Sequence, residues 1–212
     1  MILRRSALLV IAALVASSAR ATDLDVEVHG ADGTPVRDAV VTIHAVSGAT
    51  PAPRIAPGGY AIDQQNIQFH PFVTIVPQGA QVRFLNHDPL RHHVYSFSTA
   101  KRFELKLEKQ QQDRSVTFDK AGIVPLGCNI HDSMIAFIDV VDTPWAVLTD
   151  ARGRAVFHGL PSAPVSIDVW HPYLRAVGNH MSRTVPLGAS GRHEGFAVTL
   201  RAPPRPPTQS DY

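Results

Sequence analysis

Short runs of β-branched and aromatic residues recur along the chain, and turn residues separate them. Residues 24–30 (LDVEVHG) alternate apolar and polar side chains, residues 31–34 (ADGT) form a turn, and residues 35–46 continue as a second strand. Residues 70–88 give two further strands around the turn at 77–79. Helical periodicity is nearly absent, because apolar residues rarely recur at the spacing of a helix turn. The pattern predicts an all-β fold of the sandwich type.

The remaining apolar runs extend this pattern to the second half of the chain. Further strands are expected at 92–98, 103–108, 115–122, 134–142, 145–150, 155–161 and 165–172. The charges of residues 103–108 (FELKLE) would suit a short helix, but the alternation of Phe103, Leu105 and Leu107 favours a strand. Residues 47–59 are rich in Gly, Pro and Ala and predict a linker. The Pro-rich tail at 201–212 has little to bury, so we expect it to be disordered.

The first 21 residues have the features of a secretory signal. Arg4 and Arg5 form a basic head, residues 6–17 an apolar core, and residues 19–21 a small-x-small cleavage site. We therefore expect residues 1–21 to be a signal peptide, a mature chain that begins near Thr22, and export to the periplasm. No later stretch approaches the roughly 20 apolar residues that span a bilayer, so no stable membrane insertion is expected.

Size and charge narrow the function only slightly. About 190 residues remain after cleavage, enough for one large domain or two small ones with real cores. The formal net charge is +2, and the basic residues are scattered rather than gathered in an arm, so we expect no nucleic-acid partner. The sequence does not indicate an oligomeric state.

Cys128 is the only cysteine of the 212 residues. An exported protein with one cysteine forms no internal disulfide, and a spare thiol is prone to oxidation unless it is buried or bound to metal. Both explanations stay open on this residue alone, because unpaired cysteines are often simply packed in cores.

The surrounding stretch "GCNIHDSM" favours metal. It places His131 three residues after Cys128 and Met134 three residues after that. Two imidazoles, one thiolate and a weak thioether form the mononuclear blue-copper site, and the missing imidazole is available at His92 or His93 in "RHHVYSFS". Taken singly, His131 could be a surface histidine and Met134 a core residue. The conjunction of a lone exported cysteine, this spacing and an all-β frame predicts one copper ion.

Residues 68–141 resemble the plastocyanin-like branch of the cupredoxins. The resemblance rests on "VTIVPQGAQVRFLN", "HHV", "FDKAG" and "GCNIHDSM", in the family's order. It implies a Greek-key β-sandwich in which His92, Cys128 and His131 bind copper and Met134 is the axial ligand. Some relatives of this type are labelled as methylamine-utilisation proteins, an association that we do not transfer.

Two positions depart from the family's pattern. His93 replaces the Asn that usually follows the first ligand histidine and tethers the ligand loop, and Met134 follows His131 by fewer residues than in plastocyanins. Strand alternation adds a second consideration: if Tyr95 and Phe97 face the core, His93 shares their face, unless a bulge reverses the register. The resemblance selects His92.

The flanks of this segment show a second resemblance. Residues 23–48 and 144–200 together resemble one carboxypeptidase regulatory-like module, a small prealbumin-like β-sandwich, through the stretches 32–36 and 149–161. The expected organisation is therefore a discontinuous sandwich formed by both flanks, with a cupredoxin domain at 60–142 inserted between them. Such modules imply no catalysis.

These features predict a periplasmic type 1 copper protein that carries single electrons, with copper cycling between Cu(I) and Cu(II) and an unidentified redox partner protein. Copper delivery or storage is an alternative, although delivery proteins often carry Met-rich or His-rich tracts and this chain has three methionines including Met1. A structural β-protein without metal is another. We expect no enzyme, because no G-x-S-x-G motif is present and no further histidines pair at ligand spacing.

Overall fold

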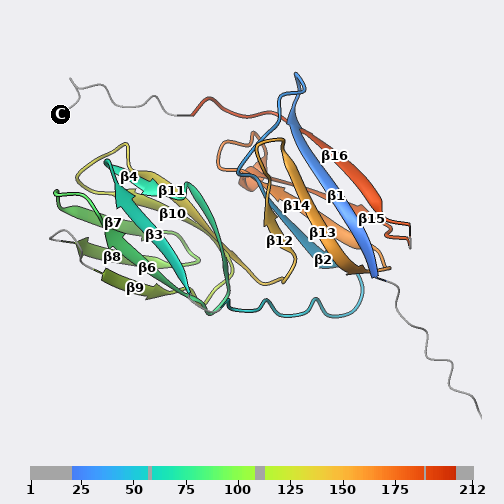
Figure 1. The fold of residues 1–212 in the computed structure, drawn as a ribbon, viewed down its shortest axis with the longest axis horizontal. Coiled ribbons are helices and arrows are strands. Elements are labelled where there is room, and N and C mark those ends of the chain that lie inside the picture. Colours follow the sequence, from blue (N-terminus) through green and yellow to red (C-terminus); the bar gives the residue numbers. More distant parts are fainter. Residues whose placement is uncertain (1–20, 57–58, 108–112, 189, 204–212) are drawn as a thin grey trace, which may run out of the picture.

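The computed structural model describes residues 21–56, 59–107, 113–188 and 190–203 (Figure 1). This part of the chain is all-β: it contains strands β1–β16 and one 3-10 turn at Val177–Asn179, and no α-helix. None of its helical segments has the length and apolar character needed to cross a membrane. Of the predicted signal peptide, residues 1–20 lie outside the described residues, and Ala21 is the first residue of β1.

The middle of the chain forms two packed sheets, here called the cysteine sandwich. One sheet has the order β4 (Gln68–His70), β3 (Tyr60–Gln65), β6 (Gln81–Asn86) and β9 (Asp113–Thr117). The other has the order β5 (Val73–Pro77), β11 (Ile135–Val141), β10 (Gly122–Cys128), β7 (His92–Phe97) and β8 (Arg102–Leu107). Alternation produces the core, as on β6, where Val82 and Phe84 are buried and Gln81 and Arg83 exposed.

The two ends of the chain form another pair of sheets, the flanking sandwich. Its three-stranded sheet has the order β13 (Arg154–Pro161), β1 (Ala21–Gly30) and β16 (Arg192–Val198). Its four-stranded sheet has the order β12 (Ala146–Leu148), β2 (Val40–Ala45), β14 (Val165–Trp170) and β15 (His180–Val185). Strands β1 and β2 pair only with strands that follow residue 145, so chain segments more than 100 residues apart share each sheet.

Aromatic side chains fill the contact between the two sandwiches. Phe137 of β11 meets Trp170 of β14 edge to face at 5.7 Å between ring centroids, and Phe72 stacks on Tyr173 at 6.0 Å. Val40 of β2 and Val73 of β5 are buried in the same cluster. The sandwiches lie side by side in Figure 1 with β11 and β12 at the contact. This junction excludes water and joins the two cores.

The segments outside the strands agree with the expected linker and shorten the expected tail. Residues 46–56 contain no regular element. Arg201 was predicted to begin a disordered tail, but its backbone N–H donates to the Tyr173 carbonyl at 2.7 Å and its guanidinium reaches the Leu174 carbonyl. The prediction was therefore wrong for Arg201, because these carbonyls satisfy its donors. Residues 204–212 lie outside the described residues.

Candidate metal centre

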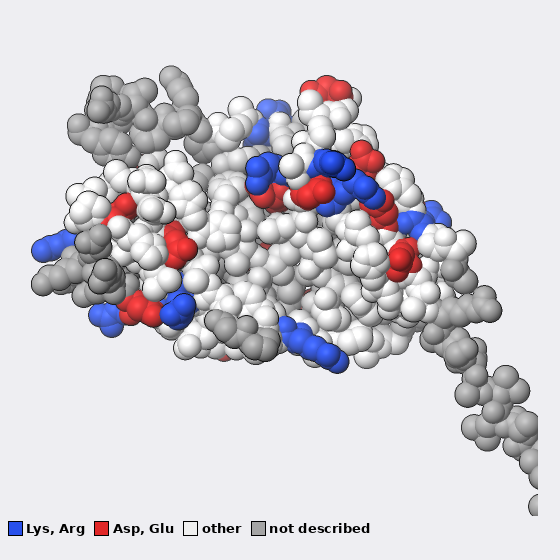
Figure 2. All heavy atoms as spheres, in the orientation of Figure 1, with Lys and Arg blue, Asp and Glu red and all other residues white. Residues whose placement is uncertain are grey.

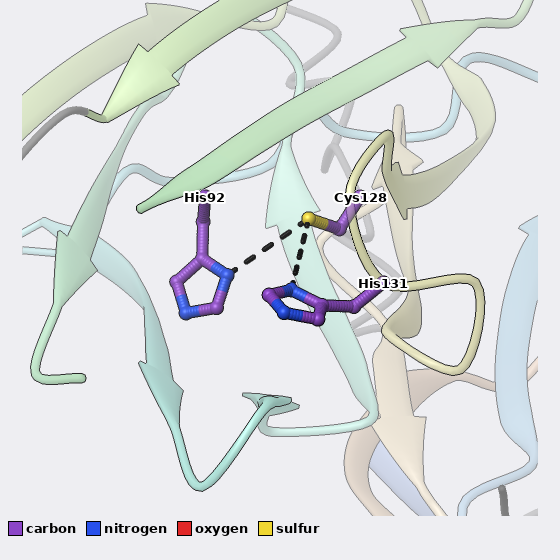
Figure 3. A group of neighbouring side chains, drawn as sticks. All are labelled: His92, Cys128 and His131. Atoms are coloured by element: carbon purple, nitrogen blue, oxygen red, sulfur yellow. Dashed lines mark hydrogen bonds between the residues drawn. The ribbon is translucent and has the colours of Figure 1, made fainter. Parts of the chain in front are cut away.

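Three predicted ligands converge at one end of the cysteine sandwich (Figure 3). His92 is the first residue of β7, Cys128 is the last of β10, and His131 lies in the loop that leads to β11. Because β7 and β10 are antiparallel neighbours, with Cys128 opposite Val94, the start of one strand meets the end of the other. The Cys128 Sγ lies 3.9 Å from His92 Nδ1 and 3.8 Å from His131 Nδ1.

The structure places His92, and not His93, beside the cysteine. His92, Val94 and Ser96 are buried, whereas Phe97 is 57% exposed. The condition under which strand alternation would favour His93, that Tyr95 and Phe97 face the core, is therefore not met. Tyr95 lies instead over Gly127 of β10, where an added Cβ would come within 2.8 Å of the tyrosine ring. The absence of a side chain at Gly127 allows a large ring on the outer face of β7.

His93 takes part in the site through its backbone. Its side chain lies toward Glu104 of β8, with 3.4 Å between Nε2 and the carboxylate. Its carbonyl accepts a hydrogen bond from the Asn129 amide at 3.0 Å, and its own amide interacts with the Cys128 sulfur. The ligand loop is thus tethered to β7 through the carbonyl and the amide of His93, which every residue except proline has.

Met134 closes the same loop. Its amide donates to the His131 carbonyl at 3.1 Å, so the chain turns back into β11 directly after the second histidine. The side chain is fully buried in the core cluster that also contains Cys128. Burial suits both the predicted axial thioether and an ordinary core methionine, and the axial role stays a prediction.

The surroundings of Cys128 favour its thiolate. Burial by itself would raise the pKa of the thiol, but the contacts with His92 and His131 and with the amides of His93 and Ile130 outweigh it. Together they lower the pKa of Cys128 from 9.0 to about 6. The sulfur is therefore largely ionised at neutral pH, and the thiolate is the form that binds metal.

A buried carboxylate that the sequence analysis missed orients His92. Asp88 Oδ2 lies 2.8 Å from His92 Nε2, and Asp88 is only 5% exposed. Burial opposes ionisation of Asp88, but the amides of Ile67 and Asn66 and the His92 ring lower the pKa of its carboxyl overall. For His92, burial opposes protonation, while Cys128 and Asp88 raise the pKa of the imidazole.

The loop that carries Asp88 is held by Asn86, the last residue of β6. The Asn86 side chain is fully buried; it accepts the Asp88 amide at 2.9 Å and donates to the Leu90 carbonyl at 2.8 Å. The stretch "NHDPLRHH" contains a signal for this network, since polar residues capable of short-range bonds cluster just before the ligand. Periodicity could not reveal it, because a loop path does not follow strand alternation.

The donor positions suit a small metal ion. Metal–sulfur bonds of about 2.3 Å and metal–nitrogen bonds of about 2.0–2.1 Å, meeting at about 120°, separate sulfur from nitrogen by roughly 3.8 Å. The observed 3.8 and 3.9 Å are close to this separation, which leaves room for one ion bonded to the sulfur and both nitrogens. All three donor atoms lie within 4.8 Å of one another.

Comparisons with known proteins find similar solved structures but do not assign the chain to a family. No protein-family model matches the chain, and no curated protein matches it. Among solved structures, an amicyanin mutant with Cu(I) is 22% identical over 47% of this chain and 99% of its own, with a TM-score of 0.36. A purple cupredoxin from Nitrosopumilus maritimus is 17% identical over 39% of this chain and 99% of its own, with a TM-score of 0.35.

A copper-containing nitrite reductase from Thermus scotoductus SA-01 is also similar, at 23% identity over 47% of this chain and a TM-score of 0.36. The match spans 25% of the reductase chain.

Proposed function

We propose that this protein binds one copper ion through His92, Cys128 and His131, with Met134 as the axial thioether, and carries single electrons in the periplasm. The observation that carries the proposal is the convergence of one thiolate and two imidazole nitrogens at sulfur–nitrogen distances of 3.8 and 3.9 Å. A bound copper ion would supply the redox chemistry by alternating between Cu(I) and Cu(II).

The donor set supports copper over other divalent ions. A thiolate is a soft ligand, and two imidazoles with one cysteine in a trigonal arrangement are typical of blue-copper sites. Structural zinc sites instead prefer four strong donors in a tetrahedron. Met134 behind the loop would add only a weak fourth donor, which imposes no strong preference between the two copper oxidation states.

The environment of the donors supports a carrier over a protein that delivers copper. His92, Cys128 and His131 are only 1%, 3% and 8% exposed, respectively. His92 and Cys128 belong to neighbouring paired strands, and main-chain bonds tether the ligand loop. A buried, rigid donor set retains its ion and changes little between oxidation states, whereas delivery requires release. The same burial leaves little room for a substrate, so we propose no enzymatic activity.

The surface beside the site suits contact with a redox partner protein, whose identity is open. Ile130, between Cys128 and His131, is 53% exposed, and Leu90, just before His92, is 46% exposed. Exposed apolar side chains next to a buried donor set could dock a partner close to the metal. Such contacts are weak and transient, as electron-transfer encounters require.

Copper binding can be tested by titrating the metal-free protein with Cu(II) while recording its visible absorption and its copper content. We expect an intense thiolate-to-copper band that saturates at one ion per chain. Titration with Zn(II) serves as the matched comparison, and we expect weaker binding. Saturation without a thiolate band would remove Cys128 from the site, and release of copper on reduction would favour delivery.

A further inference from the structure

Asp88 joins two parts of the cysteine sandwich that are separate in sequence. It lies in the loop between β6 and β7, four residues before His92, and its Oδ2 is 2.8 Å from His92 Nε2. Both residues are buried, at 5% and 1% exposure, so water competes little for this contact. A hydrogen bond to a charged group in such surroundings is short and strong.

The same carboxylate also holds the turn between β3 and β4. The amide of Asn66 donates to Asp88 Oδ1 at 2.7 Å, and the amide of Ile67 donates to Oδ2 at 3.0 Å. Asn66 and Ile67 have φ angles of +56° and +58°, in the left-handed region. A β-branched isoleucine there is a steric outlier. The two-residue turn that joins β3 to β4 requires this conformation at both positions, and the bonds to Asp88 help to hold the isoleucine in it.

The contact with Asp88 determines which nitrogen of His92 faces the cysteine. A carboxylate only accepts hydrogen bonds, so Nε2 must carry the proton that it shares with Asp88. The proton-free lone pair of a neutral His92 then lies on Nδ1, the atom 3.9 Å from the Cys128 sulfur. With the turn at 66–67 and Asn86 holding the carboxylate in place, His92 cannot turn its ring without breaking this bond.

We propose that Asp88 is a positioning residue that fixes the Nε2–H tautomer of His92 and makes Nδ1 a stronger donor, which favours Cu(II) over Cu(I). This inference rests on the proposed copper site. Carboxylates that accept from a ligand histidine fix its ring and raise its basicity, and the loss of such a partner lowers metal affinity 10–100-fold. The negative charge of Asp88 is transmitted through the imidazole to the metal, so the carboxylate lowers the reduction potential.

The test compares Asp88→Asn with Asp63→Asn. Asp63 also accepts from a histidine, His87, at 3.2 Å, but their side chains are 44% and 48% exposed and His87 is not among the predicted ligands. The first measurement uses the metal-free protein at a pH where His92 is neutral, and reads its tautomer from the imidazole ¹⁵N chemical shifts. We expect Nε2–H in the wild type and in Asp63→Asn. In Asp88→Asn we expect a gain of Nδ1–H, because an amide can donate as well as accept.

The second measurement is the reduction potential of the copper-loaded proteins. We expect Asp88→Asn to lose Cu(II) affinity about 10-fold or more relative to Cu(I), which raises the potential by about 59 mV for each factor of ten. An Nδ1–H tautomer in the wild type overturns the proposal, as does an Asp88→Asn potential equal to that of Asp63→Asn.

Failure of the variant to fold and failure of the protein to bind copper can each be distinguished from failure of this proposal. If Asp88→Asn fails to fold, Ile67→Gly is combined with it, because glycine adopts the left-handed turn without steric strain and needs no anchor. If the wild type binds no copper, the proposed function fails, while the tautomer of the metal-free protein still decides the role of Asp88.

Discussion

In the flanking sandwich, buried polar side chains join distant parts of the chain, whereas in the cysteine sandwich several of them gather at the end that holds Cys128. Thr149 of the flanking sandwich donates to the Val36 carbonyl and accepts the Ala39 amide, across more than 100 residues of sequence. In the cysteine sandwich, Asn86, Asp88, His92 and His131 are all buried around Cys128. Burial of polar groups is unfavourable unless they are paired.

The surfaces differ less than the interiors, because the cysteine sandwich also carries exposed ion pairs, between Arg83 and Asp113 and between Lys101 and Asp119. Over the flanking sandwich, acidic and basic side chains lie next to one another (Figure 2), with Arg154 paired to Asp25 and both Arg183 and Arg192 paired to Glu194. Beside the donor set, the exposed apolar side chains Leu90 and Ile130 lie next to the exposed charged residues Arg91 and Asp132. Under the proposed function, the flanking sandwich is the support, and one end of the cysteine sandwich holds the metal.

Among substitutions that test the difference between the two sandwiches, Cys128→Ser should have the largest effect, on copper binding. The hydroxyl has nearly the shape of the thiol but does not ionise at neutral pH, so we expect the thiolate-to-copper band to vanish and most copper affinity to be lost. Visible absorption and copper content measure both. Cys128→Ala is the companion variant: an unchanged copper content in both variants would mean that the cysteine is only packed.

The counterpart in the flanking sandwich is Ile167→Ala. Ile167 is fully buried in the core of that sandwich, so truncation should cost about 2–5 kcal/mol of unfolding free energy through lost burial and a cavity. The copper spectrum of the folded protein should stay the same. Urea unfolding and absorption measure the two properties. A changed copper absorption spectrum in fully folded Ile167→Ala protein would show that the flanking sandwich affects the geometry of the site.

A pH-dependent effect is expected at the contact between the sandwiches. Asp139 lies two residues after Phe137, on the face of β11 toward the flanking sandwich. Burial, and then the charge of Asp142, raise the pKa of Asp139 from 3.8 to about 6. The folded protein therefore holds the proton of Asp139 more tightly than the unfolded chain does. Protonation of Asp139 stabilises the fold most below pH 4, and this stabilisation is lost as the pH rises from about 4 to about 6.

Asparagine has no ionisable group in its side chain. We therefore expect Asp139→Asn to remove the loss of stability that Asp139 causes as the pH rises. At about 1.4 kcal/mol per pKa unit, the shift corresponds to roughly 3 kcal/mol at most. Urea unfolding of wild type and variant at pH 4 and pH 7 measures the difference, and the gain should appear at pH 7 only. An equal change at both pH values would contradict the assignment. Asp142→Asn, which removes the secondary cause, should give a smaller gain.

The smallest effect is the coupling between the two cores. Phe137 and Trp170 meet edge to face, a contact worth about 0.5–1.5 kcal/mol beyond burial. A double-mutant cycle of Phe137→Leu and Trp170→Leu, followed by urea unfolding, should give a coupling energy in that range. A value of zero would mean that the sandwiches are stable independently of one another and that the aromatic junction only covers their surfaces.

Strand periodicity predicted the all-β class because most strands have one buried and one exposed face. The pairing of strands lay beyond periodicity: β2 pairs with β14, more than 120 residues later, and alternation carries no information on such partners. The preference for a strand at 103–108 agrees with β8, since Phe103 and Leu105 pack against the core while Glu104 and Lys106 are exposed.

For the site too, the sequence predicted what depends on nearby residues and not what depends on long-range contacts. The spacing from Cys128 to His131 is local, so one loop could be predicted to bring the two together. The choice between His92 and His93 depended on which face of β7 meets the core. Alternation left it open and the resemblance selected His92; Gly127 makes room for Tyr95 outside the core. Asp88 acts through a loop whose path is set by tertiary hydrogen bonds, so no sequence period could indicate it.

The central claim, that a retained copper ion carries single electrons, is tested most directly by a reversible one-electron titration with copper analysis in each oxidation state. Because the three donors are buried and tethered, we expect oxidation and reduction curves that coincide and one copper per chain throughout. Loss of copper on reduction, or curves that do not coincide, would contradict the account.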